Sequence, residues 1–173
     1  MIKITEELYY RRIEREDLAH RVRWLNDPDI NETLTFDVPV SQASTEAWFA
    51  KTVLDSTKVN LMFFVRKGES FEPLGFGGFI NVDAKNRRAE LYITIGNKGY
   101  QGRGYGKTLV NFLTDFGFGQ LGLEKIYLST LEHNERAFRL YSSCGFEQEG
   151  FFKRHIMHQG ELKGLYYLAK FKK

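Results

Sequence analysis

The chain has 173 residues and a formal net charge of +3, and its Lys and Arg residues form no cluster dense enough to indicate nucleic-acid binding. Its 42% hydrophobic and 27% charged residues are typical of a globular protein, and the length predicts one domain, residues 1–173, with a single core. The sequence lacks a signal-peptide core and any run of about 20 apolar residues, and its one cysteine excludes an internal disulfide, so we expect a cytoplasmic protein without a membrane partner.

The N-terminal part of the chain predicts one strand followed by two helices. Residues 8–13 form the strand, and residues 14–26 form a helix with apolar side chains at helical spacing. The Asp27-Pro28 pair should end that helix, because proline cannot continue one. A second helix should start near Ser41 and carry the apolar residues of the segment 47–54.

The segment from Asn26 to Ala50 contains no Lys or Arg, and its acidic residues are Asp27, Asp29, Glu32, Asp37 and Glu46. One interpretation is a solvated surface with acids near helix starts, where the helix dipole favours them. The other is an acidic rim that attracts a cationic amine to a cleft. The sequence leaves both interpretations open.

The middle of the chain predicts three further strands, residues 61–66, 74–82 and 88–95. Short turns join them, so we expect an antiparallel meander of three or four strands. The second of these strands contains three glycines, which indicate a bulge or a close approach of another backbone: Gly75, Gly77 and Gly78.

The last third of the chain predicts two helices and three strands in the order helix, strand, helix, strand, strand: residues 106–118, 125–131, 135–143, 146–154 and 165–171. The strand that follows the first helix should lie parallel to residues 88–95, through a right-handed crossover. Together these elements predict one mixed α/β domain.

The loop that precedes the helix at Gly106 has glycine at every second position, Gly102, Gly104 and Gly106. Glycines allow the backbone to turn several N–H groups toward one point, and the free amides of the helix's first turn add to them. Arg103 and Lys107 place positive charge beside this point. The segment therefore predicts a cradle for phosphate.

Two other phosphate-binding patterns do not fit this loop. A Walker loop needs glycine where Gln101 stands, and a dinucleotide fingerprint needs a different glycine spacing. A plain strand–helix turn without a ligand is the remaining alternative.

The pattern Gln-x-x-Gly-x-Gly formed by Gln101, Gly104 and Gly106 resembles the pyrophosphate-binding signature of the GCN5-related N-acetyltransferases (GNAT), which bind coenzyme A. Asn134 and Tyr141 follow at the distance usual in that family. The segment Tyr-Ser-Ser-Cys-Gly-Phe that begins at Tyr141 is similar to the family's Tyr-x-x-x-Gly-Phe ending.

The resemblance also implies a fold and a branch of the family. The fold is a central mixed, mostly antiparallel sheet with two splayed parallel strands and helices on both faces. Ala89-Glu90-Leu91 is similar to the branch that contains ribosomal-protein alanine, polyamine and amino-sugar acetyltransferases. Dimers are frequent in this family, so a homodimer is one candidate assembly, and the oligomeric state stays open.

The resemblance implies acetyl-coenzyme A as co-substrate and no metal. The coenzyme's arm should insert between the splayed strands and pair with the backbone of residues 93–95, where the amide of Ile93 or Thr94 could also stabilise the oxyanion. The residues expected to bind the coenzyme are Ile93, Thr94, Ile95, Gln101, Gly102, Arg103, Gly104, Tyr105, Gly106, Lys107 and Asn134. Asn134 has an alternative role, because it stands where a helix cap is expected.

Two catalytic residues are proposed on this basis, each with an alternative. Tyr141 would donate its hydroxyl proton to the departing thiolate, although a tyrosine at helical spacing is also a common core residue. Glu90 would take the proton of the acceptor amine, directly or through water, although it could instead pair with Arg87 or Arg88 at the surface.

Three further side chains have reactive groups. His155 and His158 could serve as the base in place of Glu90, but no third ligand accompanies them as a metal site would require. Cys144 is interpreted as a small buried side chain and not as a nucleophile. The mechanism expected is therefore direct attack of the amine in a ternary complex.

Three functions follow from these patterns. The first is acetyl transfer to a primary amine of a small molecule, either a polyamine or an amino sugar. The second is acetylation of a protein N-terminus, as in the ribosomal-protein branch, and the third is a non-catalytic module that binds coenzyme A. The sequence does not identify the acceptor.

Overall fold

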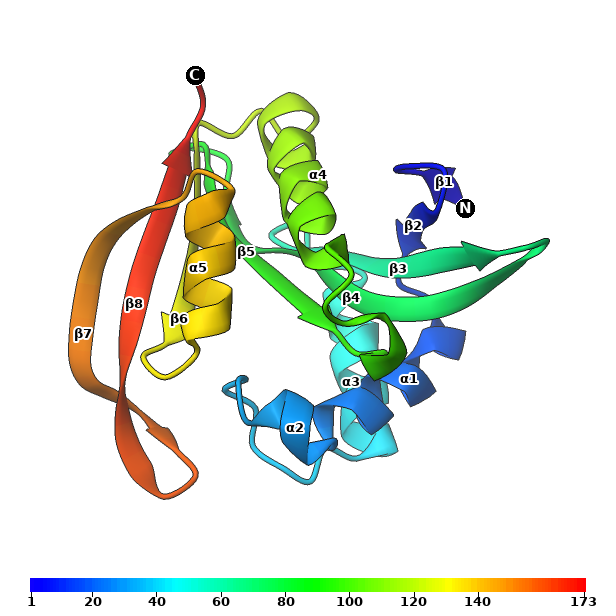
Figure 1. Cartoon of the computed structure of the whole chain (residues 1–173), viewed down its shortest axis with the longest axis horizontal. Coiled ribbons are helices and arrows are strands. Elements are labelled where there is room, and N and C mark those ends of the chain that lie inside the picture. The colour runs from blue at the N-terminus through cyan, green and yellow to red at the C-terminus, as the bar shows by residue number, and fades with distance from the viewer.

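The computed structural model describes all residues, 1–173, and one eight-stranded sheet runs through it in the order β1-β2-β3-β4-β5-β6-β8-β7 (Figure 1). All neighbouring strands are antiparallel except β5 and β6, which are parallel. The strands are β1 (Ile2–Lys3), β2 (Leu8–Arg12), β3 (Val59–Lys67), β4 (Ser70–Asp83), β5 (Arg88–Ile95), β6 (Lys125–Leu131), β7 (Glu147–His158) and β8 (Glu161–Phe171). The predicted meander, the parallel pair and the mixed, mostly antiparallel sheet are confirmed.

Helices cover both faces of this sheet, as predicted. They are α1 (Leu18–Leu25), α2 (Pro28–Asn31), α3 (Gln42–Thr52), α4 (Tyr105–Gly119) and α5 (Glu135–Ser143), with 3-10 turns at Arg15–Asp17 and Lys98–Tyr100. Leu109 and Leu113 of α4 pack with Phe63 and Phe79 in the larger core cluster. Trp24, Leu25 and Ile30 pack with Met62, Phe64 and Phe76 in a second cluster. Met62 and Phe63 are neighbours on β3, so their side chains point to opposite sides of the sheet. The two clusters therefore lie on opposite faces.

The N-terminal helices differ from the prediction at three points. The segment 14–26 is divided into a 3-10 turn and α1, because a capping box between Glu14 and Asp17 tightens its first turn. Asp27 ends α1 but also caps α2, which begins at Pro28, since proline is tolerated at the first position of a helix. The predicted inclusion of residues 53 and 54 in α3 is wrong: Leu54 lies beyond its end and is 87% exposed.

The glycines of β4 allow close contact with the neighbouring strands. Gly78 has φ +145°, and a Cβ atom there would lie 1.8 Å from the carbonyl oxygen of Val59. At Gly75 a Cβ atom would lie 2.1 Å from the carbonyl oxygen of Thr94. The predicted close backbone approach is confirmed, and no larger residue fits at either position without a backbone shift.

The closing strand pair is longer than predicted. β7 and β8 extend to a turn between His158 and Glu161, and the register shifts twice along the pair. The prediction missed residues 155–164 because their polar side chains are mostly exposed and show no buried alternation. None of the helices is long and apolar enough to span a membrane.

The feature that positions the site is the separation of β5 from β6. The parallel pairs are Arg88 with Lys125, Ala89 with Ile126 and Glu90 with Tyr127, and the two strands make no pair beyond them. Each strand keeps its antiparallel partner, β4 or β8, over its whole length. Figure 1 shows the two strands diverging like the arms of a V, with α4 and α5 in front of them. The β5 edge from Leu91 onward therefore has no strand partner.

Candidate active site

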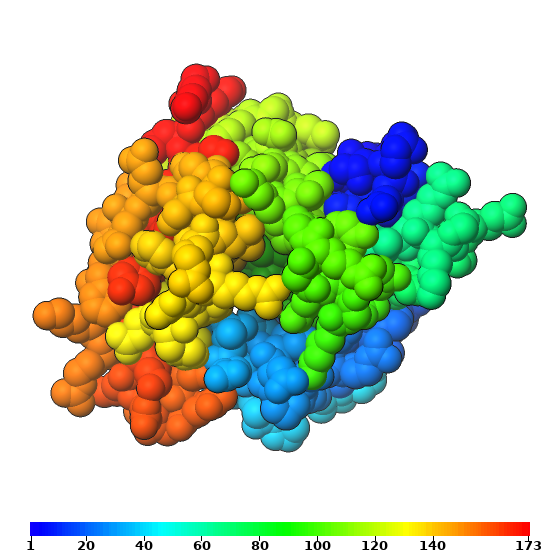
Figure 2. Space-filling model, viewed as in Figure 1, coloured from blue at the N-terminus to red at the C-terminus, as the bar shows by residue number.

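A cavity of about 1010 Å³ lies at the opening between β5 and β6. On one side its lining comes from the loop before α4 and from α5, and on the other from α1, α3 and the segment after α2. In Figure 2 the surface is hollowed between the green start of α4, the yellow α5 region and the light-blue segment around α2. The opening in the sheet thus joins two differently built halves of one cavity.

The glycine loop forms one end of this cavity. Gly102 and Gly104 adopt φ values of +77° and +83°, and Gly104 is the N-cap residue of α4. The N–H groups of residues 102–106 make no hydrogen bond within the protein, and the positions of a Cβ atom at both glycines face open space. This geometry gives an anion a set of free amides at the positive end of a fifteen-residue helix.

Side chains hold this loop in place. The Gln101 amide donates to the Ile95 carbonyl oxygen at 3.1 Å and so ties the loop to the end of β5. Tyr105 donates to Glu7 at 2.9 Å, and Arg103 lies 5.2 Å from the centre of the Tyr100 ring. Of the eleven residues predicted to bind the coenzyme, the structure brings ten to the cavity: Ile93, Thr94, Ile95, Gln101, Gly102, Gly104, Tyr105, Gly106, Lys107 and Asn134. Arg103 does not line it.

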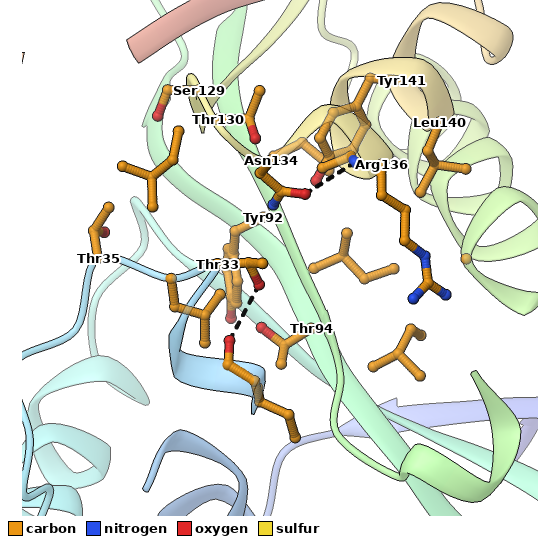
Figure 3. Close-up of a pocket in the computed structure, with 18 of the residues that line it drawn as sticks. Thr33, Thr35, Tyr92, Thr94, Ser129, Thr130, Asn134, Arg136, Leu140 and Tyr141 are labelled. Atoms are coloured by element: carbon orange, nitrogen blue, oxygen red, sulfur yellow. Dashed lines mark hydrogen bonds between the residues drawn. The ribbon is translucent and has the colours of Figure 1, made fainter. Parts of the chain in front are cut away.

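Helix α5 and its N-cap residue provide two free donors. The Oδ1 atom of Asn134 accepts from the Ala137 N–H at 3.1 Å, so the predicted cap is confirmed, whereas its side-chain NH₂ group has no partner. Tyr141, two turns further along α5, is 8% exposed, and its hydroxyl makes no hydrogen bond within the protein. Both residues line the cavity, opposite Thr33 and Thr35 (Figure 3). Burial raises the pKa of Tyr141 to about 12, so its hydroxyl stays protonated at neutral pH.

Glu90 lines the cavity from β5, beside the last parallel pair. Its carboxylate accepts a hydrogen bond from the Asn81 side chain at 3.0 Å. The predicted alternative, a surface pair with Arg87 or Arg88, is wrong, because these arginines bind Glu124 at 2.8 Å and Asp83 at 3.4 Å. Glu90 is therefore free of any cation.

The other reactive side chains lie away from the cavity. His155 is exposed and packs against Phe152, and His158 is buried against His133 with 5.4 Å between the ring centres. Neither of these two predicted alternative bases lines the cavity. Cys144 is buried and does not line it either, which agrees with its interpretation as a packing residue.

The acidic residues of the segment Asn26–Ala50 do not form a rim. Lys98 binds Asp27 at 2.7 Å and Asp29 at 2.6 Å, and Arg15 binds Glu46 at 3.3 Å. Of its five acids only Asp29 lines the cavity, so the structure favours the solvated-surface interpretation.

Several lining residues were missed by the sequence analysis. Arg136 and Arg139 of α5 line the coenzyme side, where their i, i+3 spacing next to Asn134 was an available signal. On the other side, the buried Tyr92 hydroxyl donates to Asn60 of β3, and burial raises the pKa of Tyr92. Many other residues of this side are apolar or hydroxyl-bearing, and they are accompanied by one buried guanidinium, one lysine, one carboxylate and one amide: Arg21, Asp29, Ile30, Thr33, Leu34, Thr35, Phe36, Trp48, Lys58, Ile80, Asn81 and Ser129.

Comparisons with known proteins agree with this geometry. A family model described as an acetyltransferase (GNAT) domain matches residues 7–147. The chain is 29% identical over 167 residues to a spermidine N(1)-acetyltransferase of Vibrio cholerae, covering 94% of this chain and 90% of that protein. It is also 28% identical over 171 residues to an uncharacterized N-acetyltransferase, p20, of Bacillus licheniformis, covering 98% and 95%.

The similarity extends to solved structures. A crystal structure of spermidine N-acetyltransferase from Vibrio cholerae with CoA and spermine matches with a TM-score of 0.87 and 26% identity, over 96% of both chains. A dodecameric structure of the same enzyme matches with a TM-score of 0.82. The similarity therefore extends over nearly the full length of the chain.

Coenzyme affinity separates the two roles of Asn134. Asn134→Ser keeps a side-chain cap but removes the NH₂ donor, so we expect the free energy of unfolding to change little and the coenzyme A dissociation constant to rise about 3–10-fold, the effect of one lost hydrogen bond. Asn134→Ala should show the same loss of affinity and also lose about 1 kcal/mol of stability. Calorimetric titration and urea unfolding measure the two effects.

A second variant, Gly104→Val, shows in the same titration what complete loss of coenzyme binding looks like. Gly104→Val forces a β-branched residue into a left-handed conformation at the cradle, and we expect it to abolish measurable binding. Unchanged affinity in Asn134→Ser would mean that Asn134 acts only as a helix cap.

Proposed function

The chain belongs to the GNAT family and is an acetyl-coenzyme A-dependent N-acetyltransferase, and we propose that its acceptor is a primary amine of a small molecule. The observation that carries this proposal is the continuity of the cavity. It extends from the free amides of the loop before α4, past Tyr141, to Glu90 on the far side of the β5–β6 opening. A coenzyme thioester and an amine can therefore meet inside one continuous cavity.

The coenzyme half of the cavity has a matching set of partners for each part of coenzyme A. The amides of residues 102–106 and Lys107 would bind the pyrophosphate, and Arg136 and Arg139 add positive charge nearby. The unpaired edge of β5 at residues 93–95 would take the amide groups of the arm, as an added strand would. In that position the amide of Ile93 or Thr94 can donate to the oxyanion.

The chemical step uses one group on each side of the thioester. Glu90 accepts a proton from the ammonium, directly or through water, and the freed nitrogen attacks the carbonyl carbon to form a tetrahedral intermediate. The intermediate loses its second nitrogen proton to water and its carbon–sulfur bond breaks, with the bonding electrons leaving on sulfur. Tyr141 donates its hydroxyl proton to the departing sulfur and regains one from solvent. The products are the amide, the free thiol of coenzyme A and one proton.

Two acceptor classes have support. Polyamines are supported by relatives of nearly full length, since the Vibrio cholerae enzyme is a spermidine acetyltransferase whose structure holds spermine. Amino sugars are supported by the lining, which is rich in hydroxyl and amide groups and includes only two carboxylates, Glu90 and Asp29. Protein N-termini have less support, because the relatives that cover most of the chain and are named by substrate are a spermidine and a probable spermine acetyltransferase.

Two further expectations stay predictions. These are the cytoplasmic location and the homodimer. The Vibrio cholerae enzyme has been solved as a dodecamer. Light scattering on the purified chain would give its molar mass, which can be compared with the masses of a dimer and a dodecamer.

An acceptor panel tests the proposed function. The purified chain is incubated with acetyl-coenzyme A and with spermidine, spermine, glucosamine or a short peptide with a free N-terminus, and thiol release is measured. We expect release with small amines well above release with peptides. Release with peptides alone, or with no amine at all, would contradict the proposal.

Tyr141→Phe tests the general acid. Removing one hydroxyl that makes no hydrogen bond within the protein should leave stability and coenzyme affinity nearly unchanged. Turnover should fall about 10²–10⁴-fold, the usual contribution of a positioned acid. Steady-state kinetics and calorimetry give the two quantities, and an unchanged kcat removes Tyr141 from the mechanism.

Glu90→Gln tests the base. With no carboxylate the enzyme can use only acceptor molecules that are already deprotonated, so the variant's rate should rise about tenfold per pH unit up to the pKa of the amine. At neutral pH we expect a loss of about 10²-fold. If the pH profile of kcat/KM keeps the wild-type shape, the proton goes to another group.

A further inference from the structure

Arg21 of α1 is a buried cation without a protein partner. Its side chain lines the cavity, yet the residue is only 6% exposed. No carboxylate lies within ion-pair distance of its guanidinium, none of its N–H groups donates a hydrogen bond to the protein, and its Nε atom is fully enclosed. All five N–H donors are thus unpaired within the protein, and the four on the terminal nitrogens, which are not fully enclosed, are the ones a ligand on the acceptor side can reach.

Aromatic rings fix the position of this guanidinium. Its central carbon lies 4.1 Å from the centre of the Trp48 ring, 5.2 Å from that of Phe76 and 5.4 Å from that of Phe36. These ring faces attract the positive charge but cannot accept the in-plane N–H hydrogen bonds. The rings therefore hold the guanidinium in place and leave its N–H groups without hydrogen-bond acceptors.

The charge on Arg21 is retained at neutral pH. Burial lowers the pKa of Arg21 to about 10, which is still well above 7. A buried and unpaired charge is costly for a fold, and cations in such positions usually face an anion. The other cation on this side, Lys58, already binds Asp55 at 3.1 Å, so only Arg21 lacks a counter-ion.

We propose that Arg21 binds an anionic group, a carboxylate or a phosphate, carried by the same small molecule whose amine is acetylated. The inference rests on the proposed function for the amine and narrows the acceptor class. A polyamine would place a further ammonium group beside the guanidinium, whereas an amine that also carries an acid would neutralise it through paired N–H···O bonds.

The sheet register sets the spacing of the two groups on the acceptor. Arg21 lies over Phe76, and Glu90 is paired with Ile80, four residues along β4. At ~3.3 Å per residue this corresponds to about 13 Å between the two strand positions. The acid should therefore be several bonds from the amine, as in an ω-amino acid or an amino-sugar phosphate, and not adjacent to it as in an α-amino acid.

Matched acceptors test this inference. 8-Aminooctanoate is compared with 1,8-diaminooctane, and glucosamine 6-phosphate with glucosamine, so that each pair differs only in the group that would meet Arg21. In the wild-type protein we expect kcat/KM at least about tenfold higher for the acid-bearing member of one pair, and the pair that responds identifies carboxylate or phosphate. Glycine should be a poor acceptor.

Variants of Arg21 then assign the effect to this side chain. Arg21→Met keeps an unbranched apolar side chain of similar stem without the charge, and we expect the acid-bearing preference to disappear through KM while kcat on the partner without the acid is kept. Arg21→Lys should keep part of the preference. The thermal midpoint of Arg21→Met should be equal to or above that of the wild type, because a buried charge is removed.

Two results would overturn the proposal: a wild type that does not prefer the acid-bearing member of either pair, or a ratio within the pair that is unchanged in Arg21→Met. Failure of the proposed function looks different, because no amine would then release thiol. In that case calorimetry on protein saturated with coenzyme A, which occupies the cradle, decides the inference. Heat with either acid-bearing probe that is lost in Arg21→Met supports it, and no such heat overturns it.

Discussion

The early separation of β5 from β6 is the constraint on which the rest of the structure depends. The two strands share only three parallel pairs, while β4 and β8 keep them fully hydrogen-bonded on their outer sides. Each half of the sheet is therefore complete, and the opening between them costs the fold few internal contacts. The exposed backbone edge it leaves is a set of strong hydrogen-bonding groups that needs a partner. A ligand with amide groups along its length is suited to that position.

Free hydrogen-bond donors are concentrated around this opening. The fully buried side-chain atoms without a partner are only two, Nε of Arg21, which lines the cavity, and Nε2 of His158, which does not. In contrast, the cavity collects the amides of residues 102–106, the Tyr141 hydroxyl and the Asn134 side-chain NH₂ group. Such an excess of donors in one place favours a ligand rich in carbonyl and phosphate oxygens. Coenzyme A has this composition.

Local signals predicted one half of the site well. The boundaries of β5, β6 and α5 agree with the predicted ranges, because an alternating strand, a capping asparagine and flanking glycines all act within a few residues. The glycine cradle could be predicted from the sequence for the same reason. The lack of an arginine partner at Glu90 could not be predicted in this way. Arg87 adopts φ +51° at the turn and donates to Gly122 and Glu124 instead.

The acceptor half could not be predicted, since it forms only when distant segments pack together. Arg21, Trp48 and Asn60 come from α1, α3 and β3, and nothing in their local sequence relates them to Glu90. Their contacts follow from the packing of α1 and α3 on the face of the sheet opposite α4. The acidic run before α3 illustrates the same limit, because Lys98, almost seventy residues away, neutralises Asp29.

The construction of the cavity from two sets of elements has an evolutionary consequence. The groups suited to coenzyme A lie on β5, the loop before α4 and α5, whereas most of those that would meet the amine lie on α1, α3 and the segment after α2. Substitutions in the first fifty residues can therefore change the selectivity for the acceptor while the residues that bind the acyl donor stay the same. A lineage with this scaffold can acquire new metabolites as targets without reinventing its chemistry.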